Sequence, residues 1–278
     1  MREIRVEEIE NTVAELAQQA NFVLRSDVRE ALVLAFKRES NKRAKKILQA
    51  IMENADIAKN DRLALCQDTG LPVVFVEIGQ EVHISGGSLT NALHQGIKKG
   101  YCQGALRNSI VLNPIVRGKP GFIPGVLHID VVRGRKLKLT VLPKGFGCEN
   151  KGQVKMFNPT AGIDQIKKFV VEVVKTAGPD ACPPFIVGIG MGGTQDYACL
   201  LAKKALLLKV PGHQSKATSQ LEQELLREIN QLGIGPMGLG GKTTCLGVNI
   251  AMYPTHIAGL PVAVNISCHA LRSATRVI

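Results

Sequence analysis

The sequence predicts a mixed α/β protein in which a helical N-terminal region is followed by a sheet-containing domain. Apolar residues recur at helical spacing through the first 60 residues. From residue 71 onward, short apolar runs of strand length alternate with further helical patterns. The 278 residues are enough to bury a sizeable core, and they show neither an internal repeat nor a clear linker. We therefore expect one domain over residues 1–278, with residues 1–60 as its helical part.

The first elements are expected to be three helices within residues 1–60. Val6, Ile9, Val13 and Leu16 lie three or four residues apart, and segments 28–36 and 44–57 continue in the same style. A strand is expected at 71–78. A helix should then begin near Ser88, which is a plausible N-cap, and end near Gln103.

The second half of the chain is expected to contain a hairpin followed by alternating helices and strands. Two β-rich runs, 126–132 and 136–141, are joined by the short turn Arg133-Gly134-Arg135, which is typical of a hairpin. The later elements are expected to be a helix at 163–175, a strand at 185–189, helices at 195–208 and 219–232, a glycine-rich loop at 233–241, and strands near 244–250 and 262–266.

Composition excludes several classes of protein. The chain has 35 Lys+Arg against 23 Asp+Glu, a net charge of +12, but the basic residues are scattered and there are only three Tyr and no Trp. We therefore expect no nucleic-acid partner. The positive charge would suit an anionic metabolite or an acidic partner subunit. No apolar run reaches the roughly 18 residues of a membrane span. The acidic, amphipathic N-terminus is unlike a signal peptide, which predicts a cytoplasmic location.

Two nucleotide-binding motifs are incomplete. Gly188-x-Gly190-x-x-Gly193 matches the dinucleotide fingerprint, but no second strand follows with the acidic residue that binds ribose. Close packing of a strand against a helix would explain these glycines equally well. Gly241-Lys242-Thr243 resembles a phosphate-binding loop, yet Pro236 stands where the first glycine is required. A nucleotide-dependent enzyme therefore stays a rival interpretation only.

Seven cysteines lie at 66, 102, 148, 182, 199, 245 and 268, without a CxxC pair. Their odd number and the expected cytoplasmic location argue against a disulfide framework. Cys102 and Cys199 lie in helical patterns and Cys245 in an apolar strand, so all three are expected to be small buried hydrophobic residues. Cys148 stays ambiguous.

Cys66, Cys182 and Cys268 share a different context, because each lies beside a turn-like or strand-end sequence. A rigid scaffold presents its chemistry at such places. Three thiolates from separate segments suit an iron–sulfur cluster with one iron left without a protein ligand, and that iron can act as a Lewis acid. Three ordinary thiols, a structural zinc site, or a nucleophile built from Cys182 or Cys268 and a histidine are the alternatives.

Motifs along nearly the whole chain resemble those of one enzyme family. The sequence is similar, in their order and spacing, to the α subunits of class I, iron–sulfur-dependent fumarate hydratases, a superfamily that also includes L(+)-tartrate dehydratase. The segments that carry the resemblance are Cys66-Gln67-Asp68-Thr69-Gly70, Arg107-Asn108-Ser109, Pro143-Lys144-Gly145-Phe146-Gly147, Cys182-Pro183-Pro184, residues 190–194, residues 233–244, His256-Ile257-Ala258, residues 261–265 and Cys268-His269-Ala270.

The resemblance implies a [4Fe–4S] cluster held by Cys66, Cys182 and Cys268, in a cluster-binding domain. The iron that lacks a protein ligand would bind the substrate's carboxylate and hydroxyl groups. Positions matching the family's substrate contacts are Gln67, Arg107, Gly145 and Gly147. Positions matching its catalytic residues are Asp68, as acid and base, and His256.

These roles agree with the chemistry, but each residue has a structural alternative. Dehydration of malate removes a weakly acidic proton beside a carboxylate and expels hydroxide. A Lewis acid assists that departure, while arginine and backbone donors stabilise the growing charge. Alternatively, Asp68 would cap a turn, Arg107 would be a surface cation at a helix end, and His256 would be structural.

The implied protein is a hydro-lyase of the tricarboxylic acid cycle that acts on a small dicarboxylate. Single-chain family members carry a further domain, whereas this chain ends at Ile278. We therefore expect a separate β subunit to complete the active site, in an α2β2 assembly. Residues 117–124 and Cys148 depart from the fumarate hydratase pattern, and Cys148 leans toward tartrate dehydratase. The segment 238–244 favours fumarate over tartrate. A non-catalytic cluster-binding or zinc-binding protein is the rival from another class.

Overall fold

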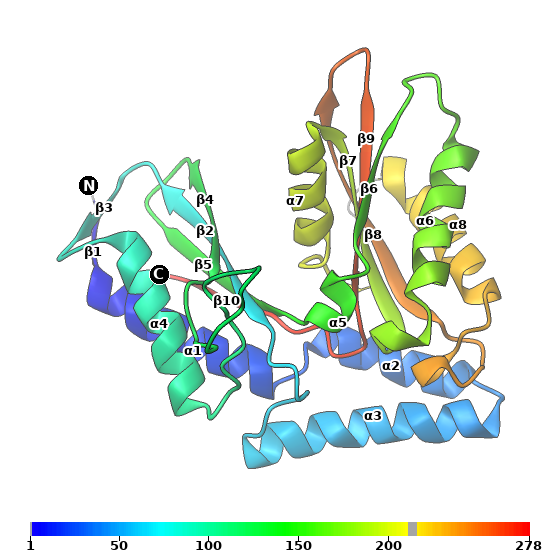
Figure 1. Cartoon of the computed structure of the whole chain (residues 1–278), viewed down its shortest axis with the longest axis horizontal. Helices are drawn as coiled ribbons and strands as arrows, with labels where there is room; N and C mark the ends of the chain where they lie inside the picture. The colour runs from blue at the N-terminus through cyan, green and yellow to red at the C-terminus, as the bar shows by residue number, and fades with distance from the viewer. Residues whose placement is uncertain (1, 211–215) are drawn as a thin grey trace. The chain divides into compact units, whose positions relative to one another are not determined.

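A computed structural model describes residues 2–210 and 216–278, and it has the expected mixed α/β fold (Figure 1). The chain divides into two compact units. Unit 1 comprises Met1–Leu24, Ala55–Phe146 and Arg272–Ile278, and unit 2 comprises Arg25–Asn54 and Gly147–Leu271. Each unit thus collects segments that are distant in the sequence. The expectation of a single domain over residues 1–278 stays a prediction.

Unit 1 is built on a four-stranded sheet with the order β10-β5-β2-β4. The strands are β2 (Leu71–Gly79), β4 (Val126–Val132), β5 (Leu137–Lys144) and β10 (Ala274–Val277). Helices α1 (Val6–Phe22) and α4 (Leu89–Gln103) pack their apolar residues against one face of this sheet. The side chain of Ser88 accepts a hydrogen bond from the Asn91 amide at 3.4 Å, which confirms the predicted N-cap of α4. The short strands β1 (Arg2–Arg5) and β3 (Val82–Ser85) form a separate parallel pair.

The predicted hairpin between β4 and β5 was wrong, because β2 lies between them. β4 pairs in parallel with β2, and β5 pairs antiparallel with the other edge of β2. The connection between β4 and β5 crosses the end of β2, where the Gly79 amide donates to the Lys136 carbonyl at 2.9 Å. A Cβ on Gly79 would lie 2.4 Å from the Gly134 carbonyl oxygen. The apolar run of β2 suits a central strand, which has a neighbour on each side. If β4 and β5 were paired directly with each other, β2 could not lie between them and would lack one of these neighbours.

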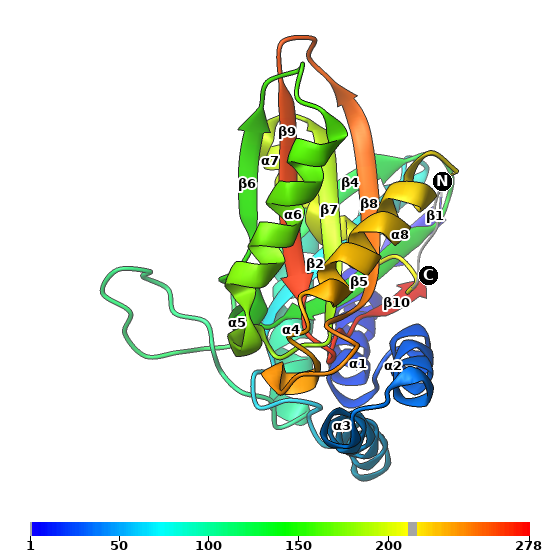
Figure 2. The same cartoon turned by 90° about the vertical axis from the view of Figure 1, so that its right-hand side faces the viewer.

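Unit 2 repeats this arrangement of strand directions in a second sheet, with the order β6-β9-β7-β8. Its strands are β6 (Gln153–Phe157), β7 (Phe185–Gly193), β8 (Cys245–Thr255) and β9 (Leu260–Ser267). β6 and β7 pair antiparallel with β9, and β7 pairs in parallel with β8. Helices α6 (Ile163–Ala177) and α8 (Lys216–Gln231) cover one face, and α7 (Gln195–Ala205) covers the other (Figure 2).

The remaining helices and turns lie outside the two sheets. Helices α2 (Ser26–Arg38) and α3 (Lys42–Asp61) complete the three predicted N-terminal helices. The short helix α5 (Phe146–Glu149) and the 3-10 turns η1 (Pro179–Ala181) and η2 (Pro236–Gly238) lie in loops. The other predicted helices and strands are confirmed with shifts of a few residues at their ends. Strands β1, β3, β6 and β10 were missed. Within the described residues, no helix is both long and apolar enough to cross a membrane.

The fingerprint-like glycines serve the packing of α7 on β7. A Cβ on Gly188 would lie 2.2 Å from the Ala202 carbonyl oxygen, and one on Gly190 would lie 2.0 Å from the Ala198 carbonyl oxygen. Both distances are far shorter than a van der Waals contact. The close strand–helix packing that the sequence offered as the alternative to nucleotide binding is therefore confirmed.

Candidate active site

The loop Cys66–Gly70 lies in unit 1, directly before β2, and its shape depends on Asp68. One carboxylate oxygen of Asp68 accepts a hydrogen bond from the Gly70 amide at 2.9 Å, and the other accepts one from the Phe146 amide at 2.8 Å. A Cβ on Gly145 would lie 3.2 Å from the second oxygen, so the absence of a side chain there leaves room for the carboxylate. Asp68 therefore caps a turn, as its structural alternative predicted. Its catalytic role stays a prediction.

Two buried side chains, which lie outside the sequence motifs, hold the carbonyl groups of this loop. The Tyr101 hydroxyl donates to the Thr69 carbonyl at 2.8 Å, and the Arg272 guanidinium donates to the Asp68 carbonyl. Burial raises the pKa of Tyr101 well above its usual value, and the nearby charge of Arg272 partly opposes this rise. The position of Arg272, four residues after Cys268, was the available sequence signal.

The loop also brings the expected substrate contacts of unit 1 together. The Thr69 hydroxyl oxygen accepts from the Arg107 amide at 3.1 Å, which ties the segment after α4 to the loop. The side chain of Arg107 is exposed and, within the described residues, forms no hydrogen bond or ion pair. Gln67 is also exposed, and its amide oxygen lies 3.4 Å from the Cys66 sulfur. Cys66, Gln67, Asp68, Arg107 and Gly145 thus form one group.

Cys182 and Cys268 lie at the same end of the sheet in unit 2. Cys182 precedes β7 and Cys268 follows β9, and the register of these two strands pairs Ile186 with Ser267. The His269 ring nitrogen Nδ1 lies 3.1 Å from the Cys182 carbonyl oxygen, which links the two cysteine loops. Cys182 has a left-handed backbone with φ of 54°, an unfavourable conformation for a residue other than glycine.

A glycine-rich loop, residues 233–241, supports the Cys182 segment. The Met237 amide donates to the Pro183 carbonyl at 2.8 Å. A Cβ on Gly238 would lie 2.2 Å from Pro179 Cβ, so this glycine permits direct contact between the two loops. At the far end of the loop, the buried carboxylate of Glu39 accepts from the Lys242 amide at 2.8 Å.

Gly147 and Cys148 adjoin the turn that leads to Cys182. The Cys148 thiol, which is buried, donates to the Ala181 carbonyl at 3.2 Å. A Cβ on Gly147 would come within 4.0 Å of the Asp180 carbonyl oxygen. The structure therefore groups Gly147 with Cys182 and Cys268.

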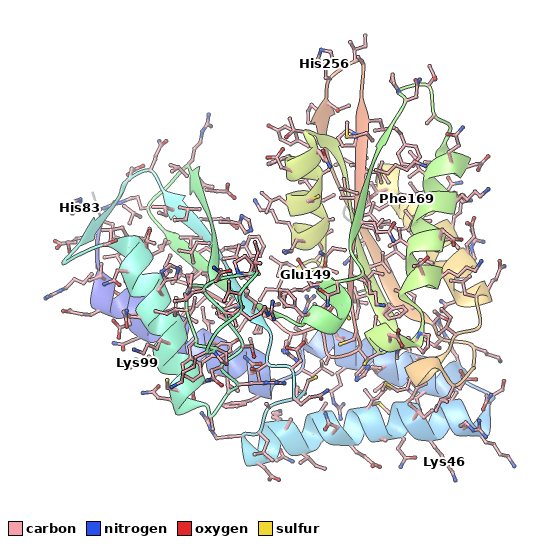
Figure 3. All side chains as sticks on the ribbon, in the orientation of Figure 1. Lys46, His83, Lys99, Glu149, Phe169 and His256 are labelled. Carbon is pink, nitrogen blue, oxygen red and sulfur yellow. The ribbon has the colours of Figure 1, made fainter. Side chains whose placement is uncertain are left out.

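His256 lies at the opposite end of the sheet in unit 2, beyond β8, and Figure 3 labels it at that tip. β7 has nine residues, and at about 3.3 Å per residue the two ends of the sheet are roughly 25–30 Å apart. His256 is exposed, and its Nδ1 accepts from the Ala258 amide at 3.1 Å, which is its structural alternative. Within one chain, the structure does not bring His256 together with Cys182 and Cys268.

The other cysteines differ from the proposed ligands in their surroundings. Cys245 is buried as expected, and burial raises its pKa to about 12. The expected burial of Cys102 and Cys199 was wrong, because both lie on exposed faces of α4 and α7. None of the seven cysteines, all within the described residues, forms a disulfide. In the described part of the chain, no three His, Cys, Asp or Glu side chains are gathered closely enough to hold a metal ion.

Comparison with known proteins places the chain among the hydro-lyases. A family model described as "Fumarate hydratase (Fumerase)" matches residues 10–277, and the chain belongs to this family. It is 42% identical over 276 residues to the putative L(+)-tartrate dehydratase subunit alpha of Methanocaldococcus jannaschii, an alignment that covers 96% of each protein. It is also 31% identical over 245 residues to the L(+)-tartrate dehydratase subunit alpha of Escherichia coli O157:H7, covering 86% of this chain and 80% of the relative.

Proposed function

We propose that this chain is the α subunit of a [4Fe–4S]-dependent hydro-lyase that interconverts fumarate and L-malate in the cytoplasm, as part of the tricarboxylic acid cycle. The observation that carries the proposal is the loop 66–70, which is held by hydrogen bonds to its backbone and to the Asp68 carboxylate. It presents a thiol, an amide and a carboxylate on consecutive residues, and it is tied to the exposed Arg107. A separate β subunit would complete the site, since the curated relatives named above are themselves α subunits.

The cysteines present fit a cluster by their chemistry. Cys66, Cys182 and Cys268 are all half-buried and lie in loops beside strands, whereas Cys148 and Cys245 are buried and Cys102 and Cys199 are exposed on helices. A cluster spreads its ligands over several metal ions, so they need not converge on one point as around a single ion. When bound, such a cluster supplies an iron with an open position, which is a Lewis acid for hydroxyl and carboxylate groups.

The chain's own residues would bind and orient the substrate. The guanidinium of Arg107 has no protein partner in the described residues, so it is available to grip a carboxylate through two parallel hydrogen bonds. Gln67 would donate its amide to the same dicarboxylate. Asp68 would hold the transferred proton on a carboxylate oxygen, since each oxygen accepts only one backbone hydrogen bond and keeps a second lone pair. The net charge of +12 would favour the approach of a dianion.

The test is co-production with the β-type subunit under anaerobic conditions, followed by assays with fumarate and L-malate. We expect brown protein with about four irons per α chain, and loss of that iron in Cys182→Ser. The α chain alone should show little turnover. Colourless protein with stoichiometric zinc, or full activity of the α chain alone, would contradict the proposal.

L(+)-tartrate is the second candidate substrate, because the relatives cited above carry that name. Tartrate has one hydroxyl more than malate, and its dehydration yields oxaloacetate. A site built to hydrogen-bond the second hydroxyl discriminates strongly against a substrate that lacks it. Comparison of kcat/KM for L-malate and both tartrate enantiomers in one preparation therefore decides between the two.

His256 enters this proposal only through a second copy of the chain, given its distance from Cys182 and Cys268. In the expected α2β2 assembly, one copy would supply His256 to the cluster site of the other. Co-production of His256→Ala and Cys182→Ser chains tests this, because mixed assemblies would then contain one intact site. Activity no greater than the sum of the two single variants would remove His256 from the catalytic set.

A further inference from the structure

Arg272 is a buried cation that forms no ion pair within the described residues. Its residue is only 3% exposed. Its guanidinium donates to the Asp68 carbonyl, while its Nε is buried and has no hydrogen-bond partner. No carboxylate among the described residues forms an ion pair with it. A buried charge without a direct ion-pair partner is unfavourable, and the nearby Asp68 is contacted through its carbonyl and not its carboxylate.

The position of Arg272 suggests what it does. It stands two residues before β10, and β10 pairs with β5 so that Ala274 faces Val141. β5 leads directly into Gly145 and Phe146, whose backbone approaches the Asp68 carboxylate. Arg272 and Tyr101 hold the adjacent carbonyls of Asp68 and Thr69, while backbone amides hold the Asp68 side chain. The loop is therefore fixed through both its backbone and its carboxylate.

We propose that Arg272 is a positioning residue for the loop Cys66–Gly70, and that the anionic groups bound at this loop balance its charge further. This inference rests on the proposed function, because those anions are the cluster thiolate of Cys66 and the substrate dicarboxylate. Arg272 also lies four residues after Cys268. The segment 268–272 thus contains both the Cys268 thiol and the arginine that holds the loop Cys66–Gly70.

An arginine suits this role better than a lysine. Its planar guanidinium offers several donors in a fixed geometry, so one N–H can hold a backbone carbonyl while the charge faces another group. Lysine would keep the charge but offer one compact ammonium on a flexible chain. Arg272→Lys therefore separates charge from geometry, and Arg272→Met removes both while keeping much of the side-chain volume.

The chain offers a matched control in Arg276, on β10. It is half-exposed, and it forms an ion pair with Glu15 at 2.5 Å. Arg276→Met deletes the same chemical group four residues away without touching the loop.

Two measurements test the inference, and the first needs no cluster. Hydrogen exchange of the purified chain should be about tenfold faster or more at the Gly70 and Phe146 amides in Arg272→Met, as expected for loss of a hydrogen bond to a charged group. Core amides of β2 and β5 should keep their protection. Arg276→Met should match the wild type. The second measurement follows the visible absorbance and iron content of the anaerobic αβ complex. In Arg272→Met, iron should be lost about tenfold faster, and kcat should fall more than KM rises.

Unchanged exchange at Gly70 and Phe146 in Arg272→Met would overturn the inference, whether or not a cluster is present. Absence of iron or turnover in the wild type would instead defeat the proposed function, while the exchange result still decides the positioning role. If Arg272→Met loses core protection throughout, Arg272→Lys decides. The Arg272→Lys variant should keep the fold and still show faster hydrogen exchange at the Gly70 and Phe146 amides. Wild-type exchange and iron retention in Arg272→Lys would refute the need for the guanidinium.

Discussion

Replacement of Glu39 by glutamine is expected to loosen the glycine-rich loop that supports the Cys182 segment. Glu39 follows α2 directly and is 4% exposed. One of its carboxylate oxygens accepts from the Ser40 and Asn41 amides, each at 2.9 Å, and the other accepts from the Lys242 amide at 2.8 Å. A single carboxylate thus bridges the end of a helix and the loop before β8.

The magnitude follows from these three bonds. In glutamine, one oxygen becomes an NH2 group, which is a donor facing a donor, and the surviving bonds lose their charge assistance. A hydrogen bond to a charged group contributes about 1.5–3 kcal/mol and a neutral one about 1 kcal/mol. Removal of a negative charge from the C-terminal end of α2 returns about 0.5 kcal/mol. We therefore expect Glu39→Gln to lower the free energy of unfolding by about 2 to 6 kcal/mol.

Urea unfolding at 25 °C measures this change, with hydrogen exchange at the Lys242 and Met237 amides as the local readout. The control is Glu53→Gln on α3, an exposed carboxylate that, within the described residues, accepts only from Gln49 at 2.8 Å. If Glu39→Gln and Glu53→Gln both remain within about 0.5 kcal/mol of the wild type, as ordinary surface substitutions do, then the carboxylate does not hold the loop and the reasoning fails.

Three further predictions concern packing, pH and thiol reactivity. In the same urea titration, Gly190→Ala should lower the free energy of unfolding by about 3 kcal/mol, because its Cβ would lie 2.0 Å from a carbonyl oxygen of α7. Gly121→Ala should stay close to the wild type, because its Cβ would find no atom nearer than 4.0 Å. The raised pKa of Tyr101 predicts that its contribution to the free energy of unfolding is fully present below about pH 10, the pKa of an unfolded tyrosine. This contribution is lost as the pH rises further, since only the unfolded state ionises. An equally steep alkaline loss of stability in Tyr101→Phe would contradict this. Iodoacetamide should modify the exposed Cys102 long before the buried Cys245, whose pKa is raised to about 12. Peptide mass spectrometry measures the order of modification, and the reverse order would refute the assignment of burial.

The sequence was sufficient wherever local pattern decides structure. The helical spacing from Val6 to Leu16 and the cap at Ser88 depend on neighbours in the chain, and both were predicted correctly. The β4–β5 hairpin failed because a short glycine-containing turn between two strands is equally compatible with a third strand between them. The pairing of β2 with both is a long-range fact that local residues do not encode.

The candidate site shows the same division. The motif 66–70 identified Cys66, Gln67 and Asp68, and the resemblance identified Arg107, because these residues are neighbours in sequence motifs. Tyr101 and Arg272 were missed because they reach the loop from 32 and 204 residues away. His256 was grouped with the cysteines by its motif, yet the strand register puts it at the far end of the sheet.

The separation of 204 residues between Asp68 and Arg272 has a consequence for how the protein is made. At about 5–20 residues per second, a ribosome needs roughly 10 to 40 s after Asp68 before Arg272 is synthesised. Until then, β5 lacks its β10 edge and the loop of the first cysteine lacks its arginine. The sheet of unit 2, which ends with β9 at Ser267, can form before that point. The loop Cys66–Gly70 would therefore reach its final conformation only after the sheet of unit 2 has been synthesised.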